Sequence, residues 1–228
     1  MQGDIFATKG LEYLIVVVYL VLLVMAVRFL APPQVAHAVG ARRARRGTPP
    51  APWFALGDGL RFHQGHTWAS DRDDEVVTVG LDDFAAQLVG APDAIALPAV
   101  GATVRQGEAA WQVRFGDRAL AMVSPVEGKV VAVNRDVLAA PQRATDDPYG
   151  GGWLLKVQAP NRRASLRNLL SGDLAVAWMR QTVERLRGLP AGGLGALLPD
   201  GGVPVRGFGR ALGSDEWDVV AREFFLTD

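Results

Sequence analysis

Two histidines are the most obvious candidates for chemistry in this 228-residue sequence. His63 and His66 lie three residues apart with Trp68 close by, and closely spaced imidazoles are candidate metal ligands. On alternating positions of a strand, however, the two side chains would point to opposite faces. We therefore expect a half-exposed strand pair here and no metal site.

Acidic residues gather at two further places. The run from Asp71 to Glu75 lies between predicted strands and indicates a hydrated turn rather than a calcium loop. Asp146 and Asp147 precede Pro148 and also indicate a turn. The sequence contains neither a phosphate-binding glycine loop nor a nucleophile elbow. These residues predict no enzyme active site.

The composition narrows the chemistry further. The chain has no cysteine, which excludes disulfides, thiolate catalysis and cysteine-ligated zinc or iron–sulfur clusters. Its formal net charge is zero, which gives no electrostatic indication of nucleic-acid binding. Of its 24 basic side chains only Lys9, Lys129 and Lys156 are lysines. We expect no metal and no cofactor on this chain, so a redox centre would belong to a partner.

The longest apolar run, Leu14 to Ala31, predicts a membrane-spanning helix. It has 18 residues and Arg28 is its only charge, so a helix at 1.5 Å per residue covers about 27 Å, close to the hydrocarbon thickness of a bilayer. A run of this length without a polar face argues against a buried helix of a soluble domain. A cleaved signal peptide is the other alternative, but only Lys9 supplies a basic start.

The charges on either side of this run predict its orientation. One cation, Lys9, precedes the run, whereas the residues that end and follow it include Arg28, Arg42, Arg43, Arg45 and Arg46. The positive-inside rule then gives a single-pass protein of the bacterial inner (cytoplasmic) membrane, with its N-terminus outside and its main domain in the cytoplasm. Residues 32–59 form a basic, proline-rich linker.

The following region has the pattern of a mainly β domain. Short apolar or alternating runs are separated by Gly, Pro, Asn and Asp, which is typical of a sandwich or barrel. The predicted strands are Arg61–His63, Thr67–Ser70, Glu75–Gly80, Ala94–Ala96, Ala109–Arg114, Arg118–Ser124, Gly128–Val133 and Trp153–Val157. A short helix is predicted over Asp82–Gln87, with Asp82 or Asp83 as its cap and with Phe84 and Leu88 facing inward.

Five motifs of this region occur in the order and spacing of one known family. They are Phe62-His-Gln-Gly-His-Thr-Trp68, Val79-Gly-Leu-Asp-Asp-Phe-Ala-Ala-Gln87, Leu97-Pro-Ala-Val-Gly-Ala-Thr-Val-Arg-Gln-Gly-Glu108, Ser124-Pro-Val-Glu-Gly-Lys-Val-Val-Ala-Val-Asn134 and Asp147-Pro-Tyr-Gly-Gly-Gly-Trp-Leu-Leu-Lys-Val157. Over about half the chain the sequence resembles the glycine cleavage system H-protein. The resemblance implies a lipoyl-type barrel-sandwich hybrid for residues 60–160.

The family's chemical group is absent from the position where the resemblance places it. H-proteins carry a lysine that becomes lipoyl-lysine at a hairpin tip, and that position corresponds to Asp117. The family's acidic residue three positions earlier corresponds to Arg114. Phe115-Gly-Asp-Arg118 predicts a two-residue turn with glycine first, so we expect the hairpin to be kept. A carboxylate cannot form the amide to lipoic acid, and no lysine lies between Lys9 and Lys129. Asp117 is therefore a vestigial lipoyl position in a degenerate member without a bound cofactor.

The C-terminal region adds helices and an arm to this domain. Helices are predicted at Ser165–Leu170 and Asp173–Arg187, within residues 161–188. The apolar side of the second consists of Leu174, Trp178, Val183 and Leu186. Residues 189–228 are predicted to be an extended apolar arm that ends in a short helix. Large apolar side chains in that helix would cover the barrel or dock into a partner, and the candidate partner-binding residues are Trp217, Val220, Phe224 and Phe225.

Together these features predict a non-catalytic, non-lipoylated, membrane-anchored scaffold or accessory subunit. By analogy we place it in a multi-subunit membrane electron-transport complex, respiratory or photosynthetic. Its expected partners are the other integral and peripheral subunits and the lipid bilayer, with no nucleic acid. One alternative is a lipoyl-type carrier that feeds a membrane-bound oxidoreductase, which needs an amine at the hairpin. The other is a membrane-fusion adaptor of an efflux or secretion system.

Overall fold

The structure is a computed structural model that describes residues 16–23, 25, 53–72, 76–188 and 204–226. The chain divides into two units, residues 1–50 and 51–228. The predicted membrane segment Leu14 to Ala31 lies partly outside the described residues, while residues 16–23 are helical. Among the described residues no helix is both long and apolar enough to cross a bilayer. Of the predicted linker, only residues 53–59 are described.

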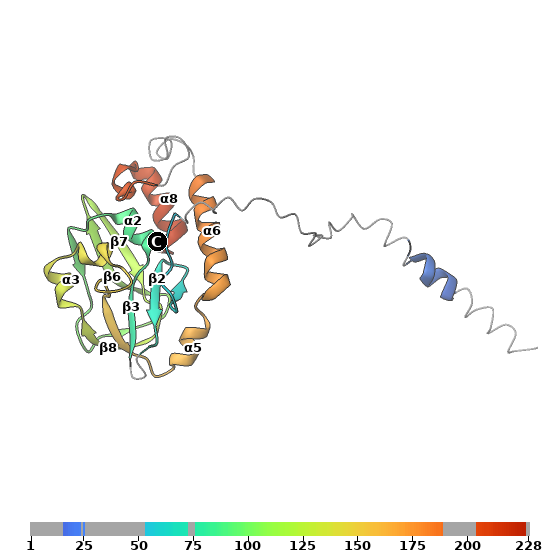
Figure 1. Ribbon diagram of the computed structural model, residues 1–228, viewed down its shortest axis with the longest axis horizontal. Helices are drawn as coiled ribbons and strands as arrows, with labels where there is room; N and C mark the ends of the chain where they lie inside the picture. The colour runs from blue at the N-terminus through green and yellow to red at the C-terminus, as the bar shows by residue number, and fades with distance from the viewer. Residues whose placement is uncertain (1–15, 24, 26–52, 73–75, 189–203, 227–228) are drawn as a thin grey trace, which may run out of the picture. The chain divides into compact units, whose positions relative to one another are not determined.

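Two antiparallel sheets form the centre of the second unit, which confirms the mainly β prediction (Figure 1). The larger sheet has the order β1-β2-β3-β9-β8-β5 and the smaller has the order β4-β6-β7. The strands are β1 (Arg61–His63), β2 (Thr67–Ser70), β3 (Val77–Leu81), β4 (Ala94–Ala96), β5 (Thr103–Val104), β6 (Ala109–Phe115), β7 (Arg118–Val123), β8 (Gly128–Val133) and β9 (Leu155–Gln158). Each of the eight predicted strands is present, with ends shifted by at most two residues. Strand β5 was missed because two residues are too few to show alternation.

Helix α2 (Asp83–Val89) has the capping residues that its sequence predicts. Asp82 is the N-cap, and its carboxylate accepts a backbone N–H of the first turn at 3.0 Å. Gly90 ends the helix at a positive φ of 72°, a conformation that glycine adopts without steric cost. Phe84 and Leu88 are fully buried, as expected. Helix α2 therefore packs against the core through the predicted residues Phe84 and Leu88.

Four more helices follow: α3 (Arg135–Ala139), α4 (Arg143–Asp146), α5 (Arg162–Arg167) and α6 (Gly172–Gly188). The fully buried residues of α6 are Ala175, Met179, Thr182 and Leu186, and Trp178 and Val183 are partly buried against the core. The predicted apolar side is therefore confirmed for Leu186, Trp178 and Val183. Leu174 is 69% exposed, so its predicted inward position is wrong, because the helix turns its Ala175 side toward Phe62 and Trp68.

The last described residues, 204–226, fold back onto the domain, and we call them the C-terminal segment. They contain the 3₁₀ helix η2 (Phe208–Ala211) and helix α8 (Ser214–Phe225). The prediction of an extended arm before the final helix is therefore wrong for the described residues 204–213. Helix η2 packs against α2 and α8 packs against β7, and Figure 1 shows α8 beside α2 and α6. Phe208 and Phe225 belong to the same buried core as Phe84 and Phe115, so this segment is part of the domain.

Candidate functional site

The β6–β7 hairpin forms as predicted, and Asp117 stands at its tip. Gly116 and Asp117 are the two turn residues between the paired Phe115 and Arg118, and Gly116 adopts the positive φ of 60°. The Asp117 side chain is 98% exposed, with the Arg118 guanidinium 4.0 Å from its carboxylate. At the position where the resemblance implies an acceptor amine, the protein thus presents a carboxylate to solvent.

The C-terminal segment holds one side of this hairpin. The guanidinium of Arg118 donates hydrogen bonds to the backbone carbonyls of Gly209 and Leu212. It also lies 5.1 Å from the centroid of the Trp217 ring, within the range of a cation–π interaction. Phe115 meets Trp217 edge to face, with ring centroids 5.3 Å apart. Both residues that flank the turn are therefore anchored to the end of the chain.

A second set of contacts holds the backbone of the turn. The Gly116 N–H donates to the Asp93 carboxylate, which lies 3.6 Å from the guanidinium of Arg210. Arg210 belongs to η2, donates to the carbonyl of Ala91 and lies 5.9 Å from the Phe115 ring centroid. The loop before β4, the hairpin turn and η2 are therefore joined through Asp93 and Arg210.

The structure corrects the prediction of a partner-binding surface on α8. Val220, Phe224 and Phe225 are at most 3% exposed, because they fill the core beneath the helix. Trp217 is half-buried between Phe115 and Arg118. Of the two alternatives left open by the sequence, the described residues follow the first: these side chains cover the barrel of their own domain.

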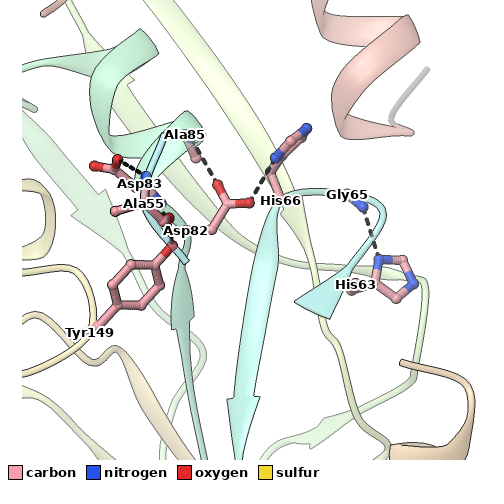
Figure 2. A network of polar contacts seen from close by, with 8 residues as sticks. All are labelled: Ala55, His63, Gly65, His66, Asp82, Asp83, Ala85 and Tyr149. Carbon is pink, nitrogen blue, oxygen red and sulfur yellow. Dashed lines mark hydrogen bonds and ion pairs between the residues drawn. The ribbon is translucent and has the colours of Figure 1, made fainter. Parts of the chain in front are cut away.

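A buried histidine–aspartate pair lies beneath this helix (Figure 2). Nδ1 of His66 is 2.8 Å from Oδ2 of Asp82, and both side chains are at most 1% exposed. Oδ1 of Asp82 accepts the N–H of Ala85, so the carboxylate is the acceptor on both sides and Nδ1 is the donor. The His66 ring stacks on Phe84 with centroids 4.0 Å apart. The pair is thus fixed between the turn after β1 and the start of α2.

The expectation of a half-exposed pair of strand histidines is wrong for His66. It lies in the turn after β1 with a φ of 58° and is buried, whereas His63 ends the strand and is half-buried. Nδ1 of His63 accepts the N–H of Gly65 at 3.0 Å. Burial, assisted by the neighbouring His66, lowers the pKa of His63. The two imidazoles therefore have separate partners.

A third set of polar contacts joins Tyr149, in the loop before β9, to Ala55 and to the start of α2 (Figure 2). The hydroxyl of Tyr149 donates to the carbonyl of Ala55 at 2.8 Å and accepts the N–H of Asp83 at 3.0 Å. The Asp83 carboxylate accepts the N–H of Ala55 at 2.7 Å. Burial raises the pKa of both the Tyr149 phenol and the Asp83 carboxyl. This arrangement fixes three segments in place.

The lysines of the domain lie on the other sheet from the hairpin. Lys129 is exposed on β8, and Lys156 is half-buried on β9 with its Nζ 5.6 Å from the Trp153 ring centroid. Strands β8 and β9 are neighbours in the six-stranded sheet, whereas the hairpin belongs to the three-stranded one. Neither amine therefore replaces the missing acceptor at the turn.

The acidic candidates have ordinary partners where they are described. Asp146 lies 2.7 Å from the guanidinium of Arg206, and Asp147 accepts the N–H of Gly151 at 2.6 Å, as a turn aspartate does. Of the run from Asp71 to Glu75, residues 73–75 lie outside the described part. The described carboxylates contact neither the hairpin nor the histidine–aspartate pair.

Sequence reasoning missed the contacts of Asp82, Arg118 and Arg210. A signal existed for the first. Strands β2 and β3 pair with Thr67 opposite Leu81, so the next residues outward, His66 and Asp82, become neighbours, and the Asp82 N–H donates to the His66 carbonyl. No local pattern indicated the partners of the two arginines, because those partners lie about 90 residues or more away in sequence.

Comparisons with known proteins find relatives in the glycine cleavage system. The model of the glycine cleavage H-protein family matches residues 60–182. The glycine cleavage system H protein of Laribacter hongkongensis is 38% identical over 102 residues, which cover 45% of this chain and 80% of that protein. The probable glycine cleavage system H protein of Pyrococcus abyssi is 30% identical over 120 residues, with coverages of 53% and 89%.

A solved structure is similar as well. The crystal structure of a glycine cleavage system H protein from Mycobacterium marinum is 27% identical, with a TM-score of 0.49, and the match covers 56% of this chain and 99% of that one. The family model spans more than half of the 228 residues, and the relatives are matched over 80% or more of their own length. The chain belongs to the glycine cleavage H-protein family.

Proposed function

We propose that this protein is a non-catalytic, non-lipoylated H-protein-like subunit that serves as a scaffold in a larger assembly. The observation that carries the proposal is the exposed carboxylate of Asp117 at the tip of an intact hairpin. Attachment of a lipoyl group needs an amine at that tip, and a carboxylate cannot form the amide. The hairpin is kept while the group that would make it a carrier is replaced.

The contacts around the turn support a fixed role for the hairpin. Arg118, Phe115 and Gly116 are held by the C-terminal segment and by Asp93, so the turn is part of a packed surface. A carrier must present its arm to several partners in turn, which requires free access around the attachment site. Here both residues that flank the turn are fixed to the C-terminal segment, while the Asp117 side chain itself stays exposed. These contacts favour a scaffold over the alternative of a lipoyl-type carrier.

We further propose that this assembly is a membrane complex of electron transport. The anchor rests on the apolar run Leu14 to Ala31 and on the arginines that follow it, such as Arg42 and Arg43. Electron transport is proposed by analogy at the level of the fold, and no residue of this chain is expected to carry a redox group. A reporter fused to the C-terminus tests the orientation, because a cytoplasmic signal is expected.

Two measurements on the full chain test the proposal. We expect the intact mass of protein purified from its native host to equal that of the unmodified chain, whereas a lipoyl adduct on any lysine would contradict it. We expect a tagged copy, purified in mild detergent, to bring a constant set of other subunits with it. Recovery of the protein alone, under conditions that keep known membrane complexes intact, would argue against a scaffold.

A further inference from the structure

Strand β7 is an edge of the three-stranded sheet, and part of its backbone points away from the sheet. Among the described strands it pairs only with β6. The residues that close a two-residue turn form a hydrogen-bonded pair, which here is Phe115 with Arg118. Since hydrogen-bonded and non-hydrogen-bonded pairs alternate along an antiparallel ladder, the N–H and C=O groups of Ala119 and Ala121 point outward. No hydrogen bond from the described residues reaches them on that side.

An open groove of about 490 Å³ lies along this edge. The stretch of β7 from Ala119 to Ala121 forms its floor, and the side of α8 that carries Asp218, Ala221 and Arg222 forms a wall. The alanine side chains are methyl groups, so another backbone can approach β7 closely. Native proteins protect an exposed edge with a lysine, a proline or a bulge. This part of β7 has none of the three.

Helix α8 lies beside β7 and runs in the same direction. Near the start of both elements, the ring of Trp217 contacts the guanidinium of Arg118. Near their ends, both elements approach Gly65. A Cβ on that glycine would lie 2.5 Å from Cγ2 of Val123 and 3.3 Å from the carbonyl oxygen of Phe225. Residues in the middle of α8 therefore lie beside the middle of β7.

Two opposite charges on α8 face this groove. Asp218 and Arg222 are exposed, line the groove and lie one helical turn apart. Because the two elements run in the same direction, Asp218 is nearer the start of β7 and Arg222 is nearer its end, on either side of Leu120. Within the described ranges the Asp218 carboxylate has no ion-pair partner, and the Arg222 guanidinium donates only to the backbone carbonyl of Asp218.

We propose that a second copy of this chain binds in the groove, with the two β7 strands paired antiparallel about a two-fold axis at Leu120. This axis brings Ala119 of each copy opposite Ala121 of the other, so the outward N–H and C=O groups gain hydrogen-bond partners. It also brings Asp218 of each copy next to Arg222 of the other, where they form ion pairs.

The order of these charges favours a second copy over an unrelated strand. A two-fold interface must be complementary to itself, and an acidic and a basic residue on either side of the axis meet this requirement. Any extended segment could pair with the free edge, but only a copy of the same surface matches both charges by symmetry. This pairing goes beyond the scaffold function and does not depend on the residue at the hairpin tip.

The test is cysteine crosslinking of the full chain in mild detergent, and the chain has no cysteine of its own to interfere. Ala119→Cys and Ala121→Cys are mixed and then oxidised. In the proposed register these positions face each other at a Cα separation of about 5.5 Å, which a disulfide can bridge. We expect the mixture to form a linked dimer faster than either variant alone, because identical positions are out of register. No dimer, or equal rates in all three samples, would overturn the proposal.

Charge reversal tests the choice of occupant. Asp218→Lys places a cation next to Arg222 of the other copy, and we expect about tenfold less crosslinking of the cysteine pair. Arg222→Glu should have a similar effect. The double variant Asp218→Lys/Arg222→Glu should restore crosslinking, because the exchanged charges match again across the axis. A double variant that crosslinks as poorly as the single ones would overturn the proposal.

Co-purification separates this proposal from the scaffold function. We expect Asp218→Lys to lose the linked dimer and to retain the other subunits that a tagged copy brings with it. Loss of those subunits would mean that one of them occupies the groove, and a second copy would be the wrong occupant. If the unchanged chain brings no subunits and still forms the dimer, the scaffold function fails and the pairing stands.

Discussion

The guanidinium of Arg118 lies 5.1 Å from the centroid of the Trp217 ring, so a residue beside the hairpin turn contacts the last helix of the chain. The same guanidinium donates to the carbonyls of Gly209 and Leu212, and only 14% of its side chain is exposed. This contact links the part of the molecule that defines its family to a segment that the family model does not match. The hairpin and the C-terminal segment therefore form one surface.

Replacement of Arg118 should release the C-terminal segment. We expect Arg118→Gln to lower the free energy of unfolding by about 1–3 kcal/mol, the usual effect of losing hydrogen bonds to a charged group. Amide hydrogen exchange should rise in η2 and α8. Arg114→Gln is the matched control, because Arg114 is exposed on the same hairpin. If exchange in α8 is the same in both variants, Arg118 does not hold the segment.

A lysine at the tip should not restore a carrier. Because Asp117 is 98% exposed, we expect Asp117→Lys to leave the midpoint of urea unfolding and the co-purifying subunits unchanged. We also expect no activity when this variant replaces an H-protein in a reconstituted glycine cleavage assay, since Arg114 still stands where the family has an acidic residue. Asp218→Lys on α8 introduces the same change of charge as a control. Loss of partners in Asp117→Lys alone would identify the tip as a contact site.

The histidine–aspartate pair should contribute strongly to stability. Asp82→Ala removes the N-cap of α2 and leaves the buried Nδ1–H of His66 without an acceptor, so we expect a loss of about 2–5 kcal/mol, from the lost cap and the unsatisfied donor together. Asp82→Asn should cost clearly less, because asparagine also caps helices and its carbonyl still accepts from Nδ1. Urea unfolding of both variants measures the difference. Equal losses would mean that the carboxylate itself, rather than an acceptor, is required.

His63 should make stability depend on pH. Its pKa in the folded protein lies below the ordinary 6.5, mainly because of burial. The unfolded chain therefore binds more protons just below pH 6.5, so the free energy of unfolding falls as the pH is lowered through that region and the effect is absent above it. His63→Asn keeps an acceptor for the Gly65 N–H and should flatten this dependence between pH 7.5 and 5.5. An unchanged slope would assign the pH dependence to other groups.

Gly90 should be essential for the contact between α2 and η2. A Cβ there would lie 2.7 Å from Cα of Gly207, and Gly90 also has a φ of 72°. We expect Gly90→Ala to destabilise the protein and to raise hydrogen exchange in η2. Gly107→Ala is the control, because Gly107 has a φ of 80° but nothing within 4 Å of its Cβ position. Both variants place a Cβ at positive φ, and Gly90 has in addition a ψ of −116°, outside the left-handed helical region, so the excess cost in Gly90→Ala combines the close approach with this backbone strain.

The sequence predicted the elements better than the contacts between them. Strands such as Gly128–Val133 and the N-cap Asp82 follow from patterns of a few residues, which are visible without the fold. The position of Leu174 on α6 was predicted incorrectly because Leu174 and Ala175 are both apolar, and only the neighbouring strands decide which of them is covered. The prediction of a hairpin with a carboxylate at its tip rested on local turn chemistry and on the family resemblance, and it is confirmed.

The rest of the site depends on contacts that are remote in sequence. The pairing of His66 with Asp82 follows from the register of β2 and β3, which a correct pairing of two predicted strands would have supplied. The position of α8 has no such signal. Its apolar residues, among them Phe224 and Phe225, fit a partner protein as well as their own barrel, and the distinction requires the shape of the surface that they cover.

The anchoring of Arg118 also sets an order of events during synthesis. The carbonyls that it binds lie 91 and 94 positions further along the chain, so this contact forms only after those residues have been synthesised. The barrel strands emerge from the ribosome earlier and can pair while Phe84 and Phe115 still lack their cover from Phe208 and Trp217. A polypeptide that stops before residue 208 would expose these rings and become a substrate for proteases. The C-terminal segment thus closes, late in synthesis, a core that the earlier strands leave open.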